Sequence, residues 1–311
     1  MAHDCGHHHS AHGLSATKLS LSIALTFLFV LIECVVGWQA KSLALISDGV
    51  HNFTDGFALI LSWYGLRAAL KPASSQNTFG LQRAGTLIAL FNSLTLILSS
   101  AYIIHEAVTR LWQPEPIQSF PMMAVAGIAV VVNLLIASWL HTGAHSDINI
   151  RSAYLHMMGD ALFSIGGIVA GAIIYNTGWQ YADPLIAIVI GGYIAYSSWG
   201  ILRETVHILL EGTPKGLDVE RMLAAVRTVP GVQDIHDLHV WTISDGIHAL
   251  SCHLRVEEAS APEVKRVVRE VKALLDIDFA VSHSTIETEC DDCAQATLYC
   301  SLETHHHSHS H

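Results

Sequence analysis

The sequence predicts an α-helical membrane protein with six transmembrane helices, followed by a small α/β domain. Hydrophobic residues make up 51% of the 311-residue chain and charged residues only 14%, whereas a typical soluble domain carries about 25% charged residues. The mean hydropathy is +0.41. Six apolar segments precede residue 203, and beyond it the composition changes to that of a soluble domain. These observations define the fold class.

Each apolar segment is close to the ~20 residues that a helix needs to cross a bilayer. Polar, Pro and Gly residues separate the segments. The expected spans are residues 17–38, 43–69, 81–104, 120–140, 152–175 and 185–202. The chain then divides into a His-rich tail (1–16), a membrane domain (17–205), a soluble domain (206–289) and a Cys/His-rich tail (290–311).

The basic residues near the ends of the spans predict that both termini lie in the cytoplasm. Cytoplasmic loops carry an excess of Lys and Arg, and with a cytoplasmic N-terminus more of these residues lie inside than outside. Six spans then return the soluble domain to the same side, so we expect a protein of the inner (plasma) membrane. The inside residues are Lys18, Arg67, Lys71, Arg83 and Arg151, and the outside residues are Lys41 and Arg110.

The soluble domain has the pattern αββαβ. Residues 217–229 and 262–275 carry apolar residues at helical spacing, and residues 235–243, 247–256 and 279–288 are expected strands. Gly246 supplies the positive φ of a tight hairpin between the first two strands. We expect an open sandwich, in which two helices cover one sheet.

Two of the predicted spans each hold a His followed four residues later by an Asp. His51 and Asp55 lie in the second span, and His156 and Asp160 lie in the fifth. Residues four apart share one face of a helix. An Asp at the bilayer centre costs about 2.5–3.5 kcal/mol, so such residues face a partner, a cavity or an ion. Two facing pairs offer two nitrogens and two oxygens, a tetrahedral set that suits Zn²⁺.

Protons compete with metal for these four groups, because neutral imidazole and ionised carboxylate are the binding forms. An unperturbed His titrates near pH ~6.5, within reach of physiological gradients. If the helices expose the four ligands alternately to each side, the protein exchanges Zn²⁺ for protons. A structural zinc site and a proton relay without metal are the alternatives.

Other residues also suggest metal binding. The chain has 21 His against 16 Lys plus Arg, many of them clustered near the two termini, and short His-rich tracts are typical of metal-binding sequences. An expression tag is the alternative for the C-terminal run. Cys290 and Cys293 form a CxxC pair, which is either a thiolate ligand pair or two free thiols. The net charge of −11 argues against a nucleic-acid partner.

Two histidines in the first expected strand are candidate ligands of the soluble domain. His236 and His239 are three residues apart. Because side chains alternate along a strand, we expect them to point to opposite faces of the sheet. At most one of them then lines a given site.

Several motifs resemble those of the cation diffusion facilitator family. Residues 42–55 read SLALISDGVHNFTD and resemble the family's second-helix signature, and His156 with Asp160 resembles its fifth-helix counterpart. FGLQR at 79–83 resembles the beginning of the third helix, LEGTP at 210–214 resembles the junction with the C-terminal domain, and VQDIHDLHVW at 232–241 also matches the family pattern. The resemblance spans residues 17–289.

The resemblance implies a homodimeric exporter of divalent cations that is driven by proton antiport. It implies that His51, Asp55, His156 and Asp160 form the transport site, in the combination of the zinc-selective branch. It also implies that the cytoplasmic domain has a metallochaperone-like fold, which dimerises and binds Zn²⁺.

Within the cytoplasmic domain, the positions that match the family's ligands are His236 (or the neighbouring His239), His253 and His283.

The resemblance is incomplete at two places. Some members carry a carboxylate two residues after the last ligand His, where this chain has Thr285, so Glu289 or the pair Cys290 and Cys293 are the expected substitutes. The loop 71–80 lacks the His or Asp that other members use for a further metal site, so we expect no site there.

Other functions fit the sequence less well than a proton-coupled Zn²⁺ exporter embedded in the lipid bilayer. An exporter of Cd²⁺, Co²⁺ or another divalent metal is the nearest alternative, because affinity order alone discriminates poorly. An intramembrane metalloprotease would need a base in an HExxH-type motif, and both motifs here are HxxxD, so we expect no enzyme. A membrane-tethered zinc sensor would not need two charged pairs in its anchor.

Overall fold

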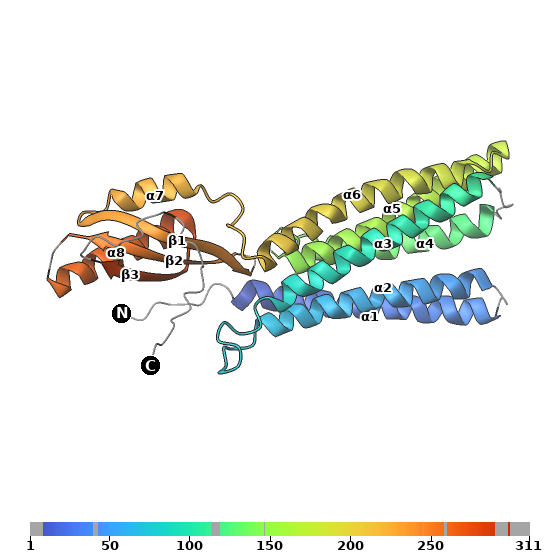
Figure 1. Ribbon diagram of the computed structural model, residues 1–311. Coiled ribbons are helices and arrows are strands. Elements are labelled where there is room, and N and C mark those ends of the chain that lie inside the picture. Colours follow the sequence, from blue (N-terminus) through green and yellow to red (C-terminus); the bar gives the residue numbers. More distant parts are fainter. Residues whose placement is uncertain are drawn as a thin grey trace, which may run out of the picture. The chain divides into compact units, whose positions relative to one another are not determined.

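The computed structural model describes residues 9–39, 43–112, 119–145, 147–244, 246–257, 260–289 and 298. The chain divides into two compact units, residues 1–207 and 208–311. The first unit contains helices and the second contains a sheet with two helices (Figure 1). Some side chains of α1, α2 and α4 lie outside the described part, and His51 and Asp55 are among them.

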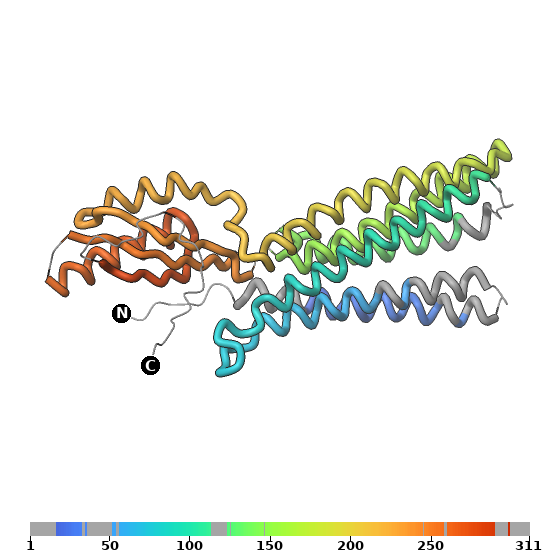
Figure 2. Tube along the Cα trace, viewed as in Figure 1, coloured from blue at the N-terminus to red at the C-terminus, as the bar shows by residue number. Residues whose placement is uncertain are grey.

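Six long helices form the first unit. Among the described residues, α3, α5 and α6 are long and apolar enough to cross a membrane, and α1 and α4 contribute the shorter apolar stretches Thr17–Ile32 and Ala126–Leu140. α1 lies beside α2, as the trace in Figure 2 shows, and α5 packs on α2, α3 and α4. The helices are α1 (His9–Gln39), α2 (Leu43–Ala69), α3 (Ala84–Trp112), α4 (Ser119–Leu140), α5 (Ile148–Thr177) and α6 (Ala182–Leu209).

Large apolar side chains on the outside of this unit mark it as a membrane domain. Leu98, Val131, Val189 and Tyr196 are between 61% and 79% exposed. A soluble protein rarely exposes apolar surface on this scale, whereas lipid tails solvate it. The polar residues go inside instead: Ser62, Asn92, Asn149 and other small polar side chains are buried. The prediction of a polytopic helical membrane domain is confirmed.

Isoleucine side chains fill the space beside glycines where α6 meets α5 and α3. A Cβ added to Gly166 of α5 would lie 2.5 Å from Ile190 Cδ1 and 2.8 Å from Ile186 Cγ2, both on α6. A Cβ on Gly191 of α6 would lie 3.0 Å from Ile104 of α3. Small residues at such contacts are how membrane helices approach one another.

The second unit has the predicted order αββαβ. Its elements are α7 (Val219–Arg227), β1 (Val232–Ser244), β2 (Ile247–Val256), α8 (Ala261–Phe279) and β3 (His283–Glu289). β2 is the central strand, antiparallel to β1 and parallel to β3. One core joins both helices to the sheet, with Met222 from α7, Val271 from α8 and Leu254 from β2 fully buried. α8 extends further than expected, to Phe279, and ends at Ala280 in the left-handed conformation, so β3 begins later than predicted.

A β-bulge in β1 overturns one prediction. His236 lies opposite His253 of β2, and His239 lies opposite Ser251, so three steps along β1 face two steps along β2. The residue at the bulge is Asp237, with φ of +47°. An extra residue shifts the alternation of side chains, and His236 and His239 therefore share one face of the sheet. The expectation that they point to opposite faces is wrong.

We expect Gly166→Ala to destabilise the membrane unit by about 1–3 kcal/mol, because the new methyl group would overpack the contact with Ile190 and Ile186. Thermal unfolding of the detergent-solubilised protein measures the effect. Gly192→Ala is the matched control, since a Cβ there meets nothing within 4 Å. Equal melting temperatures for the two variants would contradict the close contact of α5 and α6.

Candidate metal sites

The fifth helix presents one imidazole and one carboxylate in the membrane unit. α5 begins at Asp147, whose carboxylate accepts hydrogen bonds from the amides of Asn149 and Ile150. From that start, His156 and Asp160 lie one turn apart, with His156 Nε2 3.8 Å from Asp160 Oδ2. Both side chains are largely buried, at 9% and 18% exposed. The two side chains share one helix face, so both can contact the same ion.

His51 and Asp55 occupy positions on α2, although their side chains lie outside the described residues. The alignment of α2 with α5 follows from a neighbouring contact. Asn149 Nδ2 of α5 donates a hydrogen bond to the backbone oxygen of Ser62 on α2.

Counting from that hydrogen bond places the two pairs relative to one another. Asp55 is seven residues before Ser62, and His156 is seven residues after Asn149. Seven residues are nearly two turns, or about 10.5 Å along each helix axis. Because α2 and α5 run in opposite directions, both steps lead to the same side of the contact. The four backbone positions therefore lie at the same depth to within about one turn.

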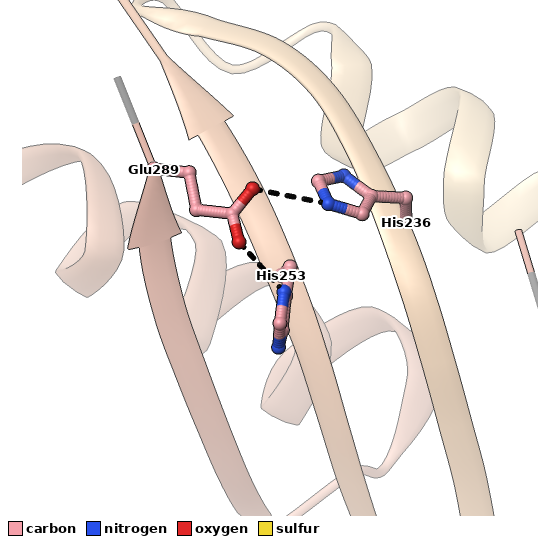
Figure 3. Close-up of side chains that lie close together, drawn as sticks. All are labelled: His236, His253 and Glu289. Atoms are coloured by element: carbon pink, nitrogen blue, oxygen red, sulfur yellow. Dashed lines mark hydrogen bonds and ion pairs between the residues drawn. The ribbon is translucent and has the colours of Figure 1, made fainter. Parts of the chain in front are cut away.

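The second unit holds a cluster of its own. Among the described residues, His236, His253 and Glu289 form the one group of three or more His, Cys, Asp or Glu residues whose potential ligand atoms all lie within 4.8 Å of one another. They come from β1, β2 and β3 respectively, and Figure 3 shows the Glu289 carboxylate facing both imidazoles. His236 Nε2 lies 3.1 Å from Glu289 Oε2, and His253 Nδ1 lies 2.8 Å from Glu289 Oε1.

The cluster fits a metal ion. Two ligand atoms on one tetrahedral Zn²⁺, each at about 2.0–2.1 Å, lie about 3.3 Å apart, close to the observed separations. His236 Nε2 and Glu289 Oε2 are buried and make no hydrogen bond of acceptable geometry. Buried polar atoms without hydrogen bonds are the exception in proteins and often indicate an ion or water. A shared cation would satisfy both.

A second set of carboxylates faces the other nitrogen of His253. His253 Nε2 lies 3.5 Å from Asp237 Oδ2 and 3.6 Å from Glu287 Oε2. Asp237 Oδ1 also lies 3.2 Å from His239 Nε2. If Nδ1 of His253 binds a metal, Nε2 carries the proton and donates toward Asp237, which fixes the tautomer and the orientation of the ring. The bulge at Asp237 is what turns this carboxylate toward the cluster.

His283, one of the expected ligands, is not in this cluster. His283 pairs with Ala249, whereas His253 pairs with Glu287, so His283 lies four residues, or about 13 Å, along β3 from the level of His253. Cys290 and Cys293 lie outside the described residues. Cys252 precedes His253 but is buried in the core, where burial and the negative charge of Asp237 raise the pKa of its thiol to about 12. That thiol stays protonated and is not available as a ligand.

Sequence reasoning named Glu289 only as a substitute ligand and did not identify Asp237. Glu289 becomes a ligand candidate because β3 is parallel to β2, which sets Arg255 opposite Glu289 and brings the end of β3 beside His253. Asp237 follows His236 directly in the sequence. The signal that could have indicated the bulge is the spacing of Ile235 and Leu238, which are three residues apart and both in the core.

The fold is that of a polytopic helical membrane protein with a small C-terminal α/β domain. The family model of the cation efflux transmembrane domain matches residues 19–210, and that of the cytoplasmic domain of cation efflux proteins matches residues 214–290. The chain belongs to the cation efflux, or cation diffusion facilitator, family.

Relatives along the full length carry names that describe metal efflux. The chain is 38% identical to the cation efflux system protein CzcD of an Alcaligenes strain, over 94% of this chain and 92% of that protein. It is 35% identical to the cadmium, cobalt and zinc/H(+)-K(+) antiporter of Bacillus subtilis, over 92% of each chain. It is 31% identical to the zinc transporter ZitB of Escherichia coli, over the whole of both. The protein is therefore a metal-cation efflux transporter and not an enzyme.

We expect His253→Ala to weaken zinc binding by the soluble domain at least 10-fold, because the substitution removes one of three clustered ligands. The measurement is calorimetric titration of the full chain in an Asp55→Asn, Asp160→Asn background, so that the membrane residues contribute little. His283→Ala is the matched control and should change the affinity less than twofold. If His283→Ala is the more damaging substitution, the cluster is wrong.

Asp237→Asn should weaken zinc binding in the same titration by about 10- to 100-fold, the usual effect of losing the carboxylate that orients a ligand His. The variant keeps the shape of the side chain and the capacity of Asn for a positive φ. The effect should be absent when His253 has already been replaced by Ala. Independent, additive losses in the double variant would contradict a role of Asp237 through His253.

Proposed function

We propose that the protein exports Zn²⁺ from the cytoplasm in exchange for protons, with His51, Asp55, His156 and Asp160 as the transport site. The observation that carries the proposal is the alignment of α2 and α5. The hydrogen bond between Asn149 and Ser62 supports a common depth for both His–Asp pairs. The pair on α5 is already buried and close, with 3.8 Å between its nearest nitrogen and oxygen.

The donor set favours zinc among divalent metals. Two imidazole nitrogens and two carboxylate oxygens make a four-coordinate site that suits Zn²⁺, whereas Mg²⁺ and Ca²⁺ prefer six or more oxygens. The names of two relatives include zinc. Cd²⁺ and Co²⁺ are the second candidates, because the name of the Bacillus relative includes both.

Proton coupling follows from the same ligands. Each imidazole must be neutral and each carboxylate ionised to hold the metal, so protons entering the site release it. When the site opens to the outside, an acidic exterior protonates the ligands and drives metal out. When it opens to a less acidic cytoplasm, the ligands lose protons and can bind the next ion. The inward proton gradient therefore drives metal outward.

The soluble domain is the second part of the proposal. His236, His253 and Glu289 bind Zn²⁺ in the cytoplasm. The excess of Lys and Arg in the loops on the same side of the membrane as the domain supports this location. Cys290, which follows Glu289 directly in the sequence, and Cys293 are the further ligands of this proposal. Two copies of the chain associate through this domain to form a homodimer.

Asp160→Asn should lower the rate of Zn²⁺ transport at least 10-fold, because an amide binds the metal more weakly and cannot exchange a proton near neutral pH. The assay is zinc flux into vesicles reconstituted with the full chain, with and without a pH gradient of two units. Wild-type flux should follow the gradient, toward the more acidic side.

A second test of the membrane site compares two histidine variants. His156→Ala should abolish gradient-driven flux. The matched control is His105→Ala, at an exposed position of α3, which should leave the flux within twofold of wild type. Gradient-independent wild-type flux would exclude proton exchange. Full flux in Asp160→Asn or His156→Ala would exclude the proposed transport site.

A further inference from the structure

A small group of polar side chains is buried where α2, α3 and α5 meet. Ser62 of α2, Asn92 of α3 and Asn149 of α5 are 0%, 2% and 1% exposed, respectively. Within a membrane domain, polar residues this deeply buried usually serve helix contacts or a pathway for ions. The contacts of these three residues decide between the two roles.

Only one half of each amide is used for helix contacts. Asn92 Nδ2 donates to Ser62 Oγ at 3.0 Å and lies 3.4 Å from the backbone oxygen of Ala58. Asn149 Nδ2 donates to the backbone oxygen of Ser62. The amide oxygens Oδ1 of Asn92 and of Asn149 are buried and have no hydrogen-bond partner in the described part of the chain. Exchanging oxygen and nitrogen would lose the bonds to backbone oxygens, from Asn92 to Ala58 and from Asn149 to Ser62, because an amide oxygen cannot donate.

The two asparagines lie between the proposed transport site and the end of the bundle that carries the loop 71–80. Asn149 is seven residues before His156, and Ser62 is seven residues after Asp55, so the group shares a helix face with the proposed ligands on both α2 and α5. Ala58, next to Asn92, is three residues from Asp55. The group lies toward the end of the bundle that carries the loop 71–80, which is the side assigned to the cytoplasm.

Their chemistry suits a passing metal ion. Buried polar atoms of a protein that lack a hydrogen-bond partner commonly contact a water molecule or an ion. A neutral amide oxygen can replace one water of a hydrated divalent cation, as backbone oxygens do in channel filters. It binds late transition metals more weakly than imidazole or carboxylate does. Such a site can bind the ion weakly enough to release it to the next ligands.

We propose that the amide oxygens of Asn92 and Asn149 form a polar step for a hydrated divalent cation between the cytoplasmic side and the transport site. At this step the cation exchanges part of its water shell for protein oxygens before it reaches the His and Asp ligands. The inference rests on the proposed function, because it assigns a path to that site. It adds residues from α3, which contributes no ligand to the site itself.

The test compares Asn92→Leu and Asn149→Leu with wild type in reconstituted vesicles, in a His253→Ala background that removes the cytoplasmic cluster. Leu has the branching and the number of side-chain heavy atoms of Asn but has no oxygen. We expect the turnover of zinc transport to fall at least 10-fold in each variant. In Asn92→Leu, which leaves the hydrogen bond between Asn149 and Ser62 in place, the zinc affinity of the transport site should stay within threefold. Asn→Ser at either position, which keeps an oxygen, should recover a substantial part of the turnover.

Two other buried hydroxyls provide matched controls. Thr26 Oγ1 on α1 and Ser198 Oγ on α6 also lack a hydrogen-bond partner among the described residues, but neither residue is on α2, α3 or α5. Thr26→Val and Ser198→Ala should transport within twofold of wild type.

Three results would overturn the polar step: normal turnover in the Leu variants, an equal loss in the controls, or a loss of zinc affinity in Asn92→Leu that parallels its loss of turnover, which would show a packing role. These failures differ from failure of the proposed function, in which transport survives the loss of Asp160 or ignores the proton gradient.

Discussion

The alignment of α2 with α5 is the constraint on which the chemistry of the membrane unit depends. The four proposed ligands come from two antiparallel helices, and a slip of one residue would turn a side chain by about 100° away from the proposed site. Asn149 fixes that alignment from α5 by donating to the backbone of Ser62. Gly65 allows it, because the Asn149 amide nitrogen lies 3.2 Å from where a Cβ would stand. The contact is polar and buried, lies two turns from the proposed ligands, and uses only the nitrogen of the Asn149 amide.

Both candidate sites use the same combination of neutral imidazole and anionic carboxylate, in different surroundings. In the membrane unit, burial makes each charge expensive unless it is paired or bound to an ion. In the soluble unit, three strands bring His236, His253 and Glu289 to one face of the sheet, opposite the face that α7 and α8 cover. Because metal and protons compete for both sets of groups, the proposed cytoplasmic site would also respond to pH and to free zinc.

Much of this structure could be predicted from the sequence, because it depends on local patterns. Apolar length predicted the helices of the membrane domain, and alternating periods predicted the order αββαβ. The position of His156 and Asp160 on one helix face follows from their spacing. Long-range register could not be predicted in the same way. The bulge at Asp237 interrupts the alternation of side chains along β1 and places His236 and His239 on one face of the sheet. The parallel pairing of β2 with β3 brings Glu289, and not His283, close to His253.

The central claim is that one zinc ion binds two imidazoles and two carboxylates inside the membrane domain. X-ray absorption at the zinc edge tests it most directly, on full-length protein with His253→Ala, Cys290→Ser and Cys293→Ser and one bound zinc. We predict four nitrogen or oxygen ligands at about 2.0–2.1 Å, with the outer-shell signature of two imidazoles. A sulfur shell near 2.3 Å, six-fold coordination, or loss of only one imidazole in the His51→Ala, His156→Ala double variant would contradict it.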